Sequence, residues 1–176
     1  MALDVSGEAL ERLVREGEGQ VVLVNLVRLR DGGAEAYKQY QAAVAQRRSE
    51  EAERQLFDLL NRERVAQGLP RLKWDDNLAS AARQHAEAMA ARNTLSHQLS
   101  GEPSLPTRVS RAGVQFISLS ENIAQGPTAA NINEQWKNSP NHRSNVLDTD
   151  VDTVGIGMAE RNGVFFAAAD FCKARH

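Results

Sequence analysis

Two histidines and one glutamate stand in polar segments where their side chains could do chemistry. His97 lies in TLSHQ, His142 lies in SPNHRSN, and Glu121 opens the small apolar run in LSENIA. Two imidazoles and a carboxylate suit a divalent cation of the zinc type, and they also suit acid–base chemistry. Because the three residues are far apart in the sequence, spacing alone favours the plainer interpretation that they are solvated loop residues.

The other notable side chains are better explained as structural. His85 falls on the apolar stripe of a predicted helix, which favours a core histidine held by one hydrogen bond. Trp74 and Trp136 are predicted core anchors, and Arg143 is predicted to pair with a carboxylate inside the domain. Cys172 is predicted to be a small buried hydrophobe. A single cysteine excludes an intrachain disulfide and a cysteine-based zinc site.

Cap and turn signals predict the elements that must position these residues. Asp75 or Asp76 can cap a helix over residues 77–92. Ser139 can cap a short helix that starts at Pro140, which places the second polar histidine in the first turn. The other predicted elements are a long loop over 93–113 ending in a helical turn (RVSRAG), a helix over 129–136, and a hairpin of strands 153–159 and 164–171 joined at Asn162-Gly163.

The first 48 residues are interpreted as a separate part of the chain. They predict a helix over 8–14, a strand over 21–30 and a helix over 34–46. So short a unit buries too little surface to be stable alone, so it must pack on the rest of the chain or on another copy. We therefore divide the chain into a helix-strand-helix appendage, 1–48, and a second domain, 51–176.

The junction between the two parts carries no obvious break. Residues 34–67 contain neither glycine nor proline, and Gly68 is the first stop signal. One long helix, or two helices joined near residues 47–49, both agree with this pattern. Leu56 and Leu60 give the second stretch a clear apolar face.

Composition narrows the function classes. The chain has 176 residues, 25% of them charged, and a net charge of −2, which fits a folded globular protein and argues against nucleic-acid or anionic-membrane binding. The N-terminus is too charged for a signal peptide, and its apolar stretch over 21–27 is far shorter than the ~20 residues of a membrane helix. As written, the chain predicts a cytoplasmic protein without a transmembrane segment.

Residues 51–171 resemble the CAP superfamily of cysteine-rich secretory proteins, antigen 5 and plant pathogenesis-related class 1 proteins, and its bacterial SCP-like branch most. The matching segments are LLNRERVAQGLPRLKWDDNLASAARQHAEAMAARNTLSH, RVSRAGVQFISLSENIAQG, EQWKNSPNHRSNVLD and VGIGMAERNGVFFAAADF, in the family's order. The resemblance implies an α+β fold, a three-layer α-β-α sandwich with a central cleft. In many members that cleft holds two histidines and two glutamates.

The cleft residues carry over one by one. His97 matches the first histidine, Glu121 the first glutamate and His142 the second histidine. The position of the second glutamate is Ser139, with Asn145 expected as a further polar neighbour. Losing one carboxylate lowers the negative charge available to a cation, which weakens the expectation of a bound zinc ion or other divalent cation.

The resemblance implies a binding module more than an enzyme. Some members bind lipids, sterols or extracellular partners, so we expect a His/Glu cleft that takes a divalent cation or a small ligand without turnover. One alternative is a metal-dependent peptidase or esterase, with Glu121 as acid/base or third ligand. The missing second glutamate and the lack of a helical HExxH pair count against it. A third hypothesis is a structural protein assembled through the N-terminal strand.

Residues 21–46 are similar to the first half of small ferredoxin-like proteins that pair into dimeric α+β barrels. Only one strand and one helix match, so the resemblance suggests a homodimerisation or docking element. The CAP family is usually secreted, whereas this chain as written lacks an export signal. The appendage stands where that signal would be expected.

Overall fold

The computed structural model describes residues 33–175 of the chain, which divides into two compact units, Met1–Arg48 and Ser49–His176. The predicted helix over 8–14, the predicted strand over 21–30 and the ferredoxin-like pairing of that strand lie outside the described residues. Helix α3 spans Gly33–Ala66 as one helix, which answers the open question of one helix or two.

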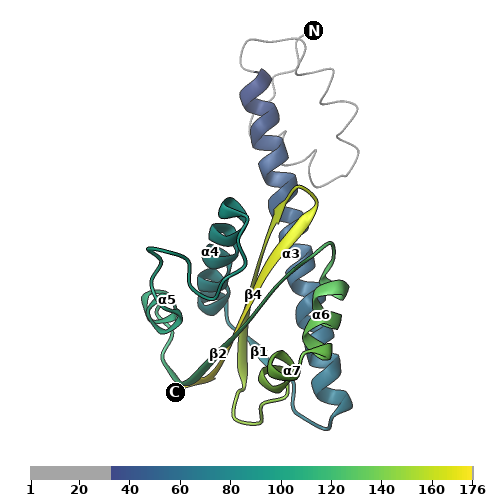
Figure 1. Cartoon of the computed structure of the whole chain (residues 1–176), viewed down its shortest axis with the longest axis vertical. Coiled ribbons are helices and arrows are strands. Elements are labelled where there is room, and N and C mark those ends of the chain that lie inside the picture. The colour runs from purple at the N-terminus through teal and green to yellow at the C-terminus, as the bar shows by residue number, and fades with distance from the viewer. Residues whose placement is uncertain (1–32, 176) are drawn as a thin grey trace. The chain divides into compact units, whose positions relative to one another are not determined.

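The second unit contains a four-stranded sheet in the order β1-β3-β4-β2 (Figure 1). Strand β3 pairs in parallel with β1 and antiparallel with β4, and β4 pairs antiparallel with β2. Besides α3, the described elements are β1 (Lys73–Trp74), α4 (Asp76–Arg92), α5 (Leu105–Arg111), β2 (Phe116–Gly126), α6 (Ala129–Asn138), α7 (Pro140–Val146), β3 (Thr153–Arg161) and β4 (Val164–Ala174).

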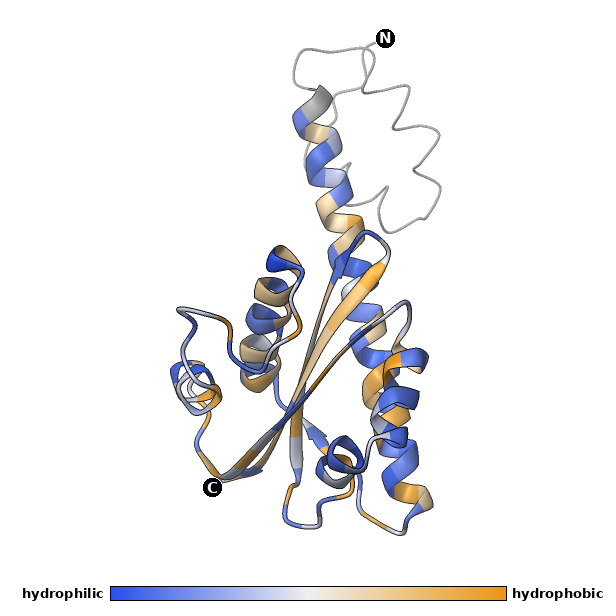
Figure 2. Cartoon of the chain, in the orientation of Figure 1, coloured by the Kyte–Doolittle hydropathy of each residue, from blue (hydrophilic) through white to orange (hydrophobic). Residues whose placement is uncertain are grey.

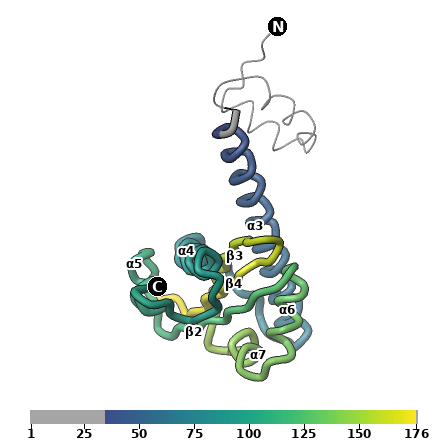
Figure 3. The backbone as a smooth tube through the Cα atoms, turned by 45° about the horizontal axis from the view of Figure 1, so that its top comes forward, coloured from purple at the N-terminus to yellow at the C-terminus, as the bar shows by residue number. Residues whose placement is uncertain are grey.

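Helices cover both faces of the sheet, as Figures 1 and 3 show. Helices α4 and α5 pack on one face, where Met89 contacts Phe166 and Ala168 in an apolar cluster. Residues 49–66 of α3 pack with α6 and α7 on the other face, around Trp136 and Phe171. The predicted α-β-α sandwich is therefore confirmed. The central strands carry mainly apolar colours in Figure 2, as expected for a sheet buried on both sides.

Helix α4 lies unusually close to β3 because two strand positions lack side chains. The side chain of Asp75 accepts a hydrogen bond from the N–H of Leu78 at 2.7 Å and caps the helix, as predicted. A Cβ atom added at Gly155 or Gly157 would overlap the backbone of α4. These glycines therefore bring α4, and the loop that follows it, down onto the sheet.

A buried arginine fixes the segment that follows α7. The Arg64 guanidinium donates to the carbonyls of Val146 and Asp148, both at 2.8 Å, and to that of Val151 at 3.3 Å. It also donates to the Pro70 carbonyl at 2.9 Å. Because Arg64 is fully buried in α3, these bonds hold the end of α7 against the core.

The structure corrects several predicted boundaries. Helix α5 begins at Leu105, before the predicted helical turn. Ser139 stands at the N-terminus of α7 but makes no side-chain capping bond there. The hairpin turn has only two residues, Asn162 and Gly163, with φ of 51° and 78°, so the strands run longer than predicted. Strand β2 was missed because its polar side chains, in FISLSENIAQG, obscure the strand pattern.

Candidate functional site

The candidate site is built around Glu121 on β2. Its Oε1 lies 2.8 Å from Nδ1 of His97, and its Oε2 accepts a 2.6 Å bond from the Arg108 guanidinium. Glu121 and Arg108 are both buried, with side chains only 3% and 6% exposed. The carboxylate is therefore held from two sides, by an arginine of α5 and by a histidine of the loop after α4.

His97 has one ring nitrogen committed and one open. A carboxylate can only accept, so neutral His97 must donate from Nδ1 to Glu121, which leaves the lone pair on Nε2. The His97 side chain is 61% exposed, in contrast to the buried carboxylate behind it. The imidazole thus presents an acceptor, or a metal-ligating nitrogen, to solvent.

A second glutamate, which the sequence analysis did not single out, borders this buried pair. Glu102 Oε1 lies 2.7 Å from Nδ1 of His85, and Oε2 accepts the Leu99 N–H at 3.0 Å. Burial opposes the ionisation of Glu102, but the bonds from Leu99 and His85, with the charges of His85 and Arg108, lower its pKa. Glu102 is therefore a carboxylate at neutral pH.

His85 connects the two glutamates. Its ring is fully buried, with Nδ1 on Glu102 and Nε2 lying 3.7 Å from Glu121 Oε2. The prediction of a core histidine held by one hydrogen bond is confirmed, since Nε2 has no hydrogen-bond partner within residues 33–175. What the sequence did not indicate is that this core histidine borders the candidate site.

Asp170 adds a fully buried carboxyl group next to Glu121. The two residues pair directly across β2 and β4, so their side chains lie on the same face. Burial, reinforced by the negative charge of Glu121, raises the pKa of Asp170 well above its ordinary value. Its surroundings therefore favour the protonated form of Asp170 over the carboxylate.

His142 reaches the site from the opposite face of the sheet. Its carbonyl accepts a 2.9 Å bond from the side chain of Asn122, which in turn accepts one from Asn145 at 2.8 Å. Burial and the charge of nearby His97 lower the pKa of His142. Asn122 and Asn145 thus attach α7 to β2, and the two histidines are close enough to interact electrostatically.

The predicted site residues are only partly connected. His97 and Glu121 are in direct contact, Asn145 acts through Asn122, and Ser139 makes no side-chain hydrogen bond within the described part of the chain. Across residues 33–175, no three or more His, Cys, Asp or Glu side chains are arranged to hold a metal ion.

Three residues of the cluster were missed from sequence: the half-buried Glu102 and the buried Arg108 and Asp170. Each lies in a segment that reads as ordinary loop, helix or strand, and only the fold brings them within reach of Glu121. Cys172, by contrast, is fully buried as predicted. Burial, together with the charges of nearby aspartates, raises the pKa of its thiol to about 11.

The fold and the sequence together define the class of protein. The chain matches the Cysteine-rich secretory protein family, CAP, over residues 57–171, and it belongs to that family. Two relatives come from Bacillus subtilis (strain 168). The "Uncharacterized membrane protein YlbC" is 38% identical over 111 residues, covering 61% of this chain and 31% of the relative. The "Uncharacterized protein YkwD" is 31% identical over 114 residues, covering 64% and 44%.

Solved structures agree with this assignment. An extracellular protein from Bacillus anthracis that contains an SCP domain has a TM-score of 0.68 at 28% identity, covering 77% of this chain and 43% of that one. An outer surface protein from Borrelia burgdorferi has the same fold, with a TM-score of 0.66 at 23% identity and coverage of 71% and 94%. The chain spans less than half the length of the two Bacillus subtilis relatives.

None of the described helices combines the length and apolar character needed to cross a bilayer. The cytoplasmic location expected from the sequence finds no support among these relatives, since two structural neighbours carry the descriptions extracellular and outer surface.

Proposed function

We propose that this CAP domain is a binding module that holds a divalent cation between His97 and His142, without turnover. The observation that carries the proposal is the state of His97. Its Nδ1 is bonded to the buried Glu121 carboxylate at 2.8 Å while the ring is 61% exposed. A carboxylate behind a histidine fixes the tautomer and the ring direction, as in zinc sites where a carboxylate supports the ligand.

Glu121 supports the cation without ligating it in this proposal. Its second oxygen is bonded to Arg108 at 2.6 Å, so the arginine already supplies the positive charge that a directly bound metal would bring. This differs from the hypothesis of a site in which Glu121 is the third ligand. A site formed by the two histidines also needs no glutamate at position 139, where this chain has a serine.

His142 is suited to be the second ligand. Burial and the charge of His97 lower its pKa, so at neutral pH the ring is uncharged and has a lone pair to give. Zinc sites that keep open coordination positions accept water or a ligand there. Because only two protein side chains ligate the cation, we expect the domain to bind it weakly. A small-molecule ligand would occupy one of the open coordination positions.

Zinc titration of the full chain tests the proposal. We expect binding by calorimetry at pH 7, loss of binding in His97→Ala and in His142→Ala, and weaker binding in Glu121→Gln because the supporting carboxylate is gone. Gln98→Ala, an exposed neighbour of His97, is the control that should bind as the wild type does. Equal heats for the wild type and the two histidine variants would overturn the proposal.

Hydrolysis is the second candidate function. The feature that favours it is the same carboxylate-backed imidazole, which is the arrangement of a general base. Panels of peptidase and esterase substrates, with and without a chelator, test it in the wild type and in His97→Ala. Turnover that disappears in the variant would replace the binding proposal with this one.

The location and assembly of the protein are also matters of proposal. We propose that the domain works outside the cytoplasm, because the Bacillus anthracis neighbour is described as extracellular.

Assembly through the strand predicted over residues 21–30 is tested by sedimentation of the full chain against a chain starting near Glu51. A monomeric mass for both chains would remove the homodimer hypothesis. A lipid or another small molecule is a further candidate ligand for the cleft.

A further inference from the structure

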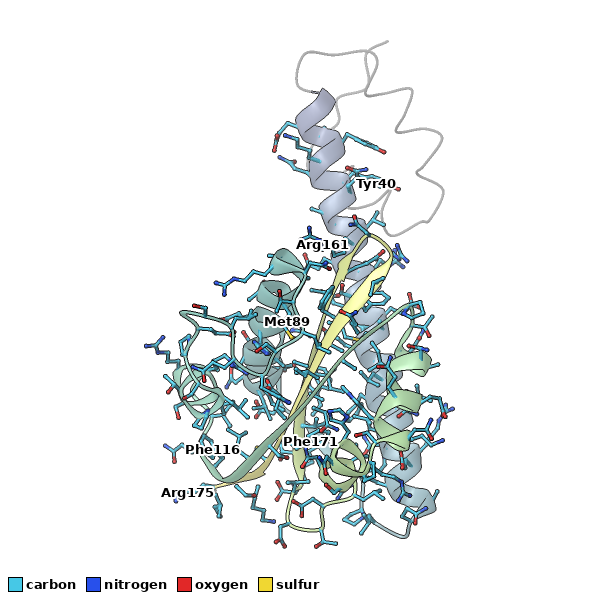
Figure 4. All side chains as sticks on the ribbon, viewed as in Figure 1. Tyr40, Met89, Phe116, Arg161, Phe171 and Arg175 are labelled. Atoms are coloured by element: carbon cyan, nitrogen blue, oxygen red, sulfur yellow. The ribbon has the colours of Figure 1, made fainter. Side chains whose placement is uncertain are left out.

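A polar cavity of about 560 Å³ lies between α4 and α5, and none of its lining residues ligates the proposed cation. Its volume falls in the range of about 300–1,000 Å³ that is usual for pockets that bind small molecules. The two helices lie side by side in Figures 1 and 3. In Figure 4 the labelled Met89 lies on α4, and the labelled Phe116 marks the start of β2, shortly after α5.

One wall of the cavity is a row of uncharged polar side chains on α4. Asn77, Ser80 and Gln84 form this row, at the i, i+3 and i+7 positions that share one face of a helix. Within residues 33–175 none of the three side chains has a hydrogen-bond partner, so each can bond a ligand. Amide and hydroxyl groups both donate and accept. The row therefore suits a ligand that offers donors and acceptors in turn, as a peptide main chain does.

Two charged side chains line the cavity near opposite ends of this row. Glu102 is beside His85, since its Oε1 lies 2.7 Å from Nδ1 of that residue. At the other end, Ala112, next to Arg111, packs against the apolar cluster that contains Leu78. Positions 78 and 85 of α4 are about 10 Å apart along the helix, at its rise of ~1.5 Å per residue. The cavity thus has a negative end and a positive end.

Both charged groups can bond a ligand of opposite charge. A carboxylate has about four acceptor positions, and on Glu102 the bonds from His85 and one main-chain N–H occupy two of them. Arg108 also lines the cavity, 3.7 Å from Glu102, but its nearer partner is Glu121 at 2.6 Å. Arg111 is exposed and forms no salt bridge with any described residue. An ammonium group at one end and a carboxylate at the other would complement the cavity.

We propose that this cavity binds a short peptide, about three residues long, whose N-terminus and C-terminus are both free. The peptide's ammonium group would bond Glu102, and its carboxylate would bond the Arg111 guanidinium, whose planar fork matches a carboxylate. An extended tripeptide spans about 10 Å, at ~3.3–3.6 Å per residue, which matches the separation of the two ends. The row on α4 would bond the main chain between them. The site would therefore select peptides by length and by their two charged ends.

Nuclear magnetic resonance titration of the full, metal-free chain with trialanine tests the proposal. We expect shifts in the amide signals of residues 77–84 and 102–112, with a Kd between about 0.1 and 1 mM. Acetyl-trialanine lacks the ammonium group and trialanine amide lacks the carboxylate, so each should bind about tenfold more weakly. Dialanine is too short to reach both ends, so it should bind about as weakly as the blocked peptides.

Two variants assign the charged ends. Arg111→Gln should weaken trialanine binding about tenfold but leave the affinity for trialanine amide unchanged, because that peptide has no carboxylate to lose. Glu102→Gln should weaken trialanine binding and leave the affinity for acetyl-trialanine unchanged. Arg62→Gln, which replaces an exposed arginine of α3 outside the cavity, is the matched control and should bind as the wild type does. If Glu102→Gln fails to fold by circular dichroism, Arg111→Gln and the blocked peptides decide.

Three results would overturn the proposal. The first is no shift at residues 77–84 and 102–112 at about 10 mM trialanine, tenfold above the weakest expected Kd. The second is a blocked peptide that binds as tightly as trialanine, because the cavity would then take a simple anion or a simple amine. The third is equal binding of trialanine by Arg111→Gln and the wild type. Because no zinc is present, a failure of zinc binding would count against the cation proposal alone.

Discussion

Two neighbouring residues of β2, Glu121 and Asn122, face opposite sides of the sheet and meet opposite environments. Glu121 faces α4 and α5 and belongs to an ionic cluster with Arg108 and His97. Asn122 faces α7 and makes only neutral hydrogen bonds, to the His142 carbonyl and to Asn145. One strand therefore supplies both the charged and the uncharged wall of the candidate site.

The difference shows how the fold separates stability from binding. The α3–α6 face is filled by large apolar side chains such as Trp136 and Phe171, which supply burial. The α4 face has small residues on the sheet, among them Gly155, Gly157 and Ala168, and it accommodates buried charges beside them. A buried ionic cluster is weak as a source of stability but strong as a source of fixed orientation.

The largest expected effect is on the apolar face. Trp136 is fully buried and its Nε1 donates to the Ile123 carbonyl, so Trp136→Ala should lower the free energy of unfolding by about 3–5 kcal/mol. Urea denaturation measures it. Trp74 is half-buried and meets Phe57 edge-on at 5.4 Å, so Trp74→Ala should cost clearly less. Equal costs would mean that the face of α6 is not the main core.

The next effect is on the charged face. Arg108→Met leaves the carboxylate of Glu121 buried without its arginine and should cost about 3 kcal/mol of unfolding free energy. The double variant Arg108→Met with Glu121→Gln should recover about 1 kcal/mol of this, because the unpaired charge is gone. A double-mutant cycle with no coupling would contradict the ion pair.

Two aspartates should respond to pH in opposite directions. Asp170 has a raised pKa, so the folded state holds its proton more tightly than the unfolded state does. Stability from Asp170 therefore falls as pH rises from about 4 toward its folded pKa. Asp152 is opposed by burial, but Lys173 leads the bonds that lower its pKa to about 2. Its contribution is fully present above its ordinary pKa of 3.8 and is lost as pH falls from there to about 2.

Unfolding curves from pH 2 to 8 check both signs. Asp170→Asn should remove the decline in stability that the wild type shows as pH rises above about 4. Asp152→Asn should flatten the acid side instead. If Asp170→Asn left the neutral side unchanged, Asp170 would be ionised in the folded protein.

The smallest effect is on a pair outside both faces. Arg71 donates to Asp58 at 3.3 Å, and both side chains are more than half exposed. Asp58→Asn should change the unfolding free energy by less than about 0.5 kcal/mol, and salt should reduce even that. A larger loss would show that surface charge contributes more here than the comparison of the two faces implies.

Local signals predicted local structure well. The Asp75 cap, the Asn162-Gly163 turn and the start of α7 at Pro140 each depend on a few adjacent residues, and the structure has all three features. Strand β2 was missed, because a strand between two different faces carries polar and apolar residues without regular alternation. The organisation of residues 1–48 stays a prediction.

The sequence by itself determined the family, the sandwich fold and the choice of His97, Glu121 and His142 as candidate site residues. It could do so because motifs and helix periodicity depend on residues that are close together in the chain. Tertiary structure decided their roles. Only folding brings Arg108 against Glu121 and Asp170 beside it, since those contacts join separate elements. Whether a buried carboxylate is a ligand, a support or a neutral acid depends on these neighbours, and charge interactions act through space without regard to distance along the chain.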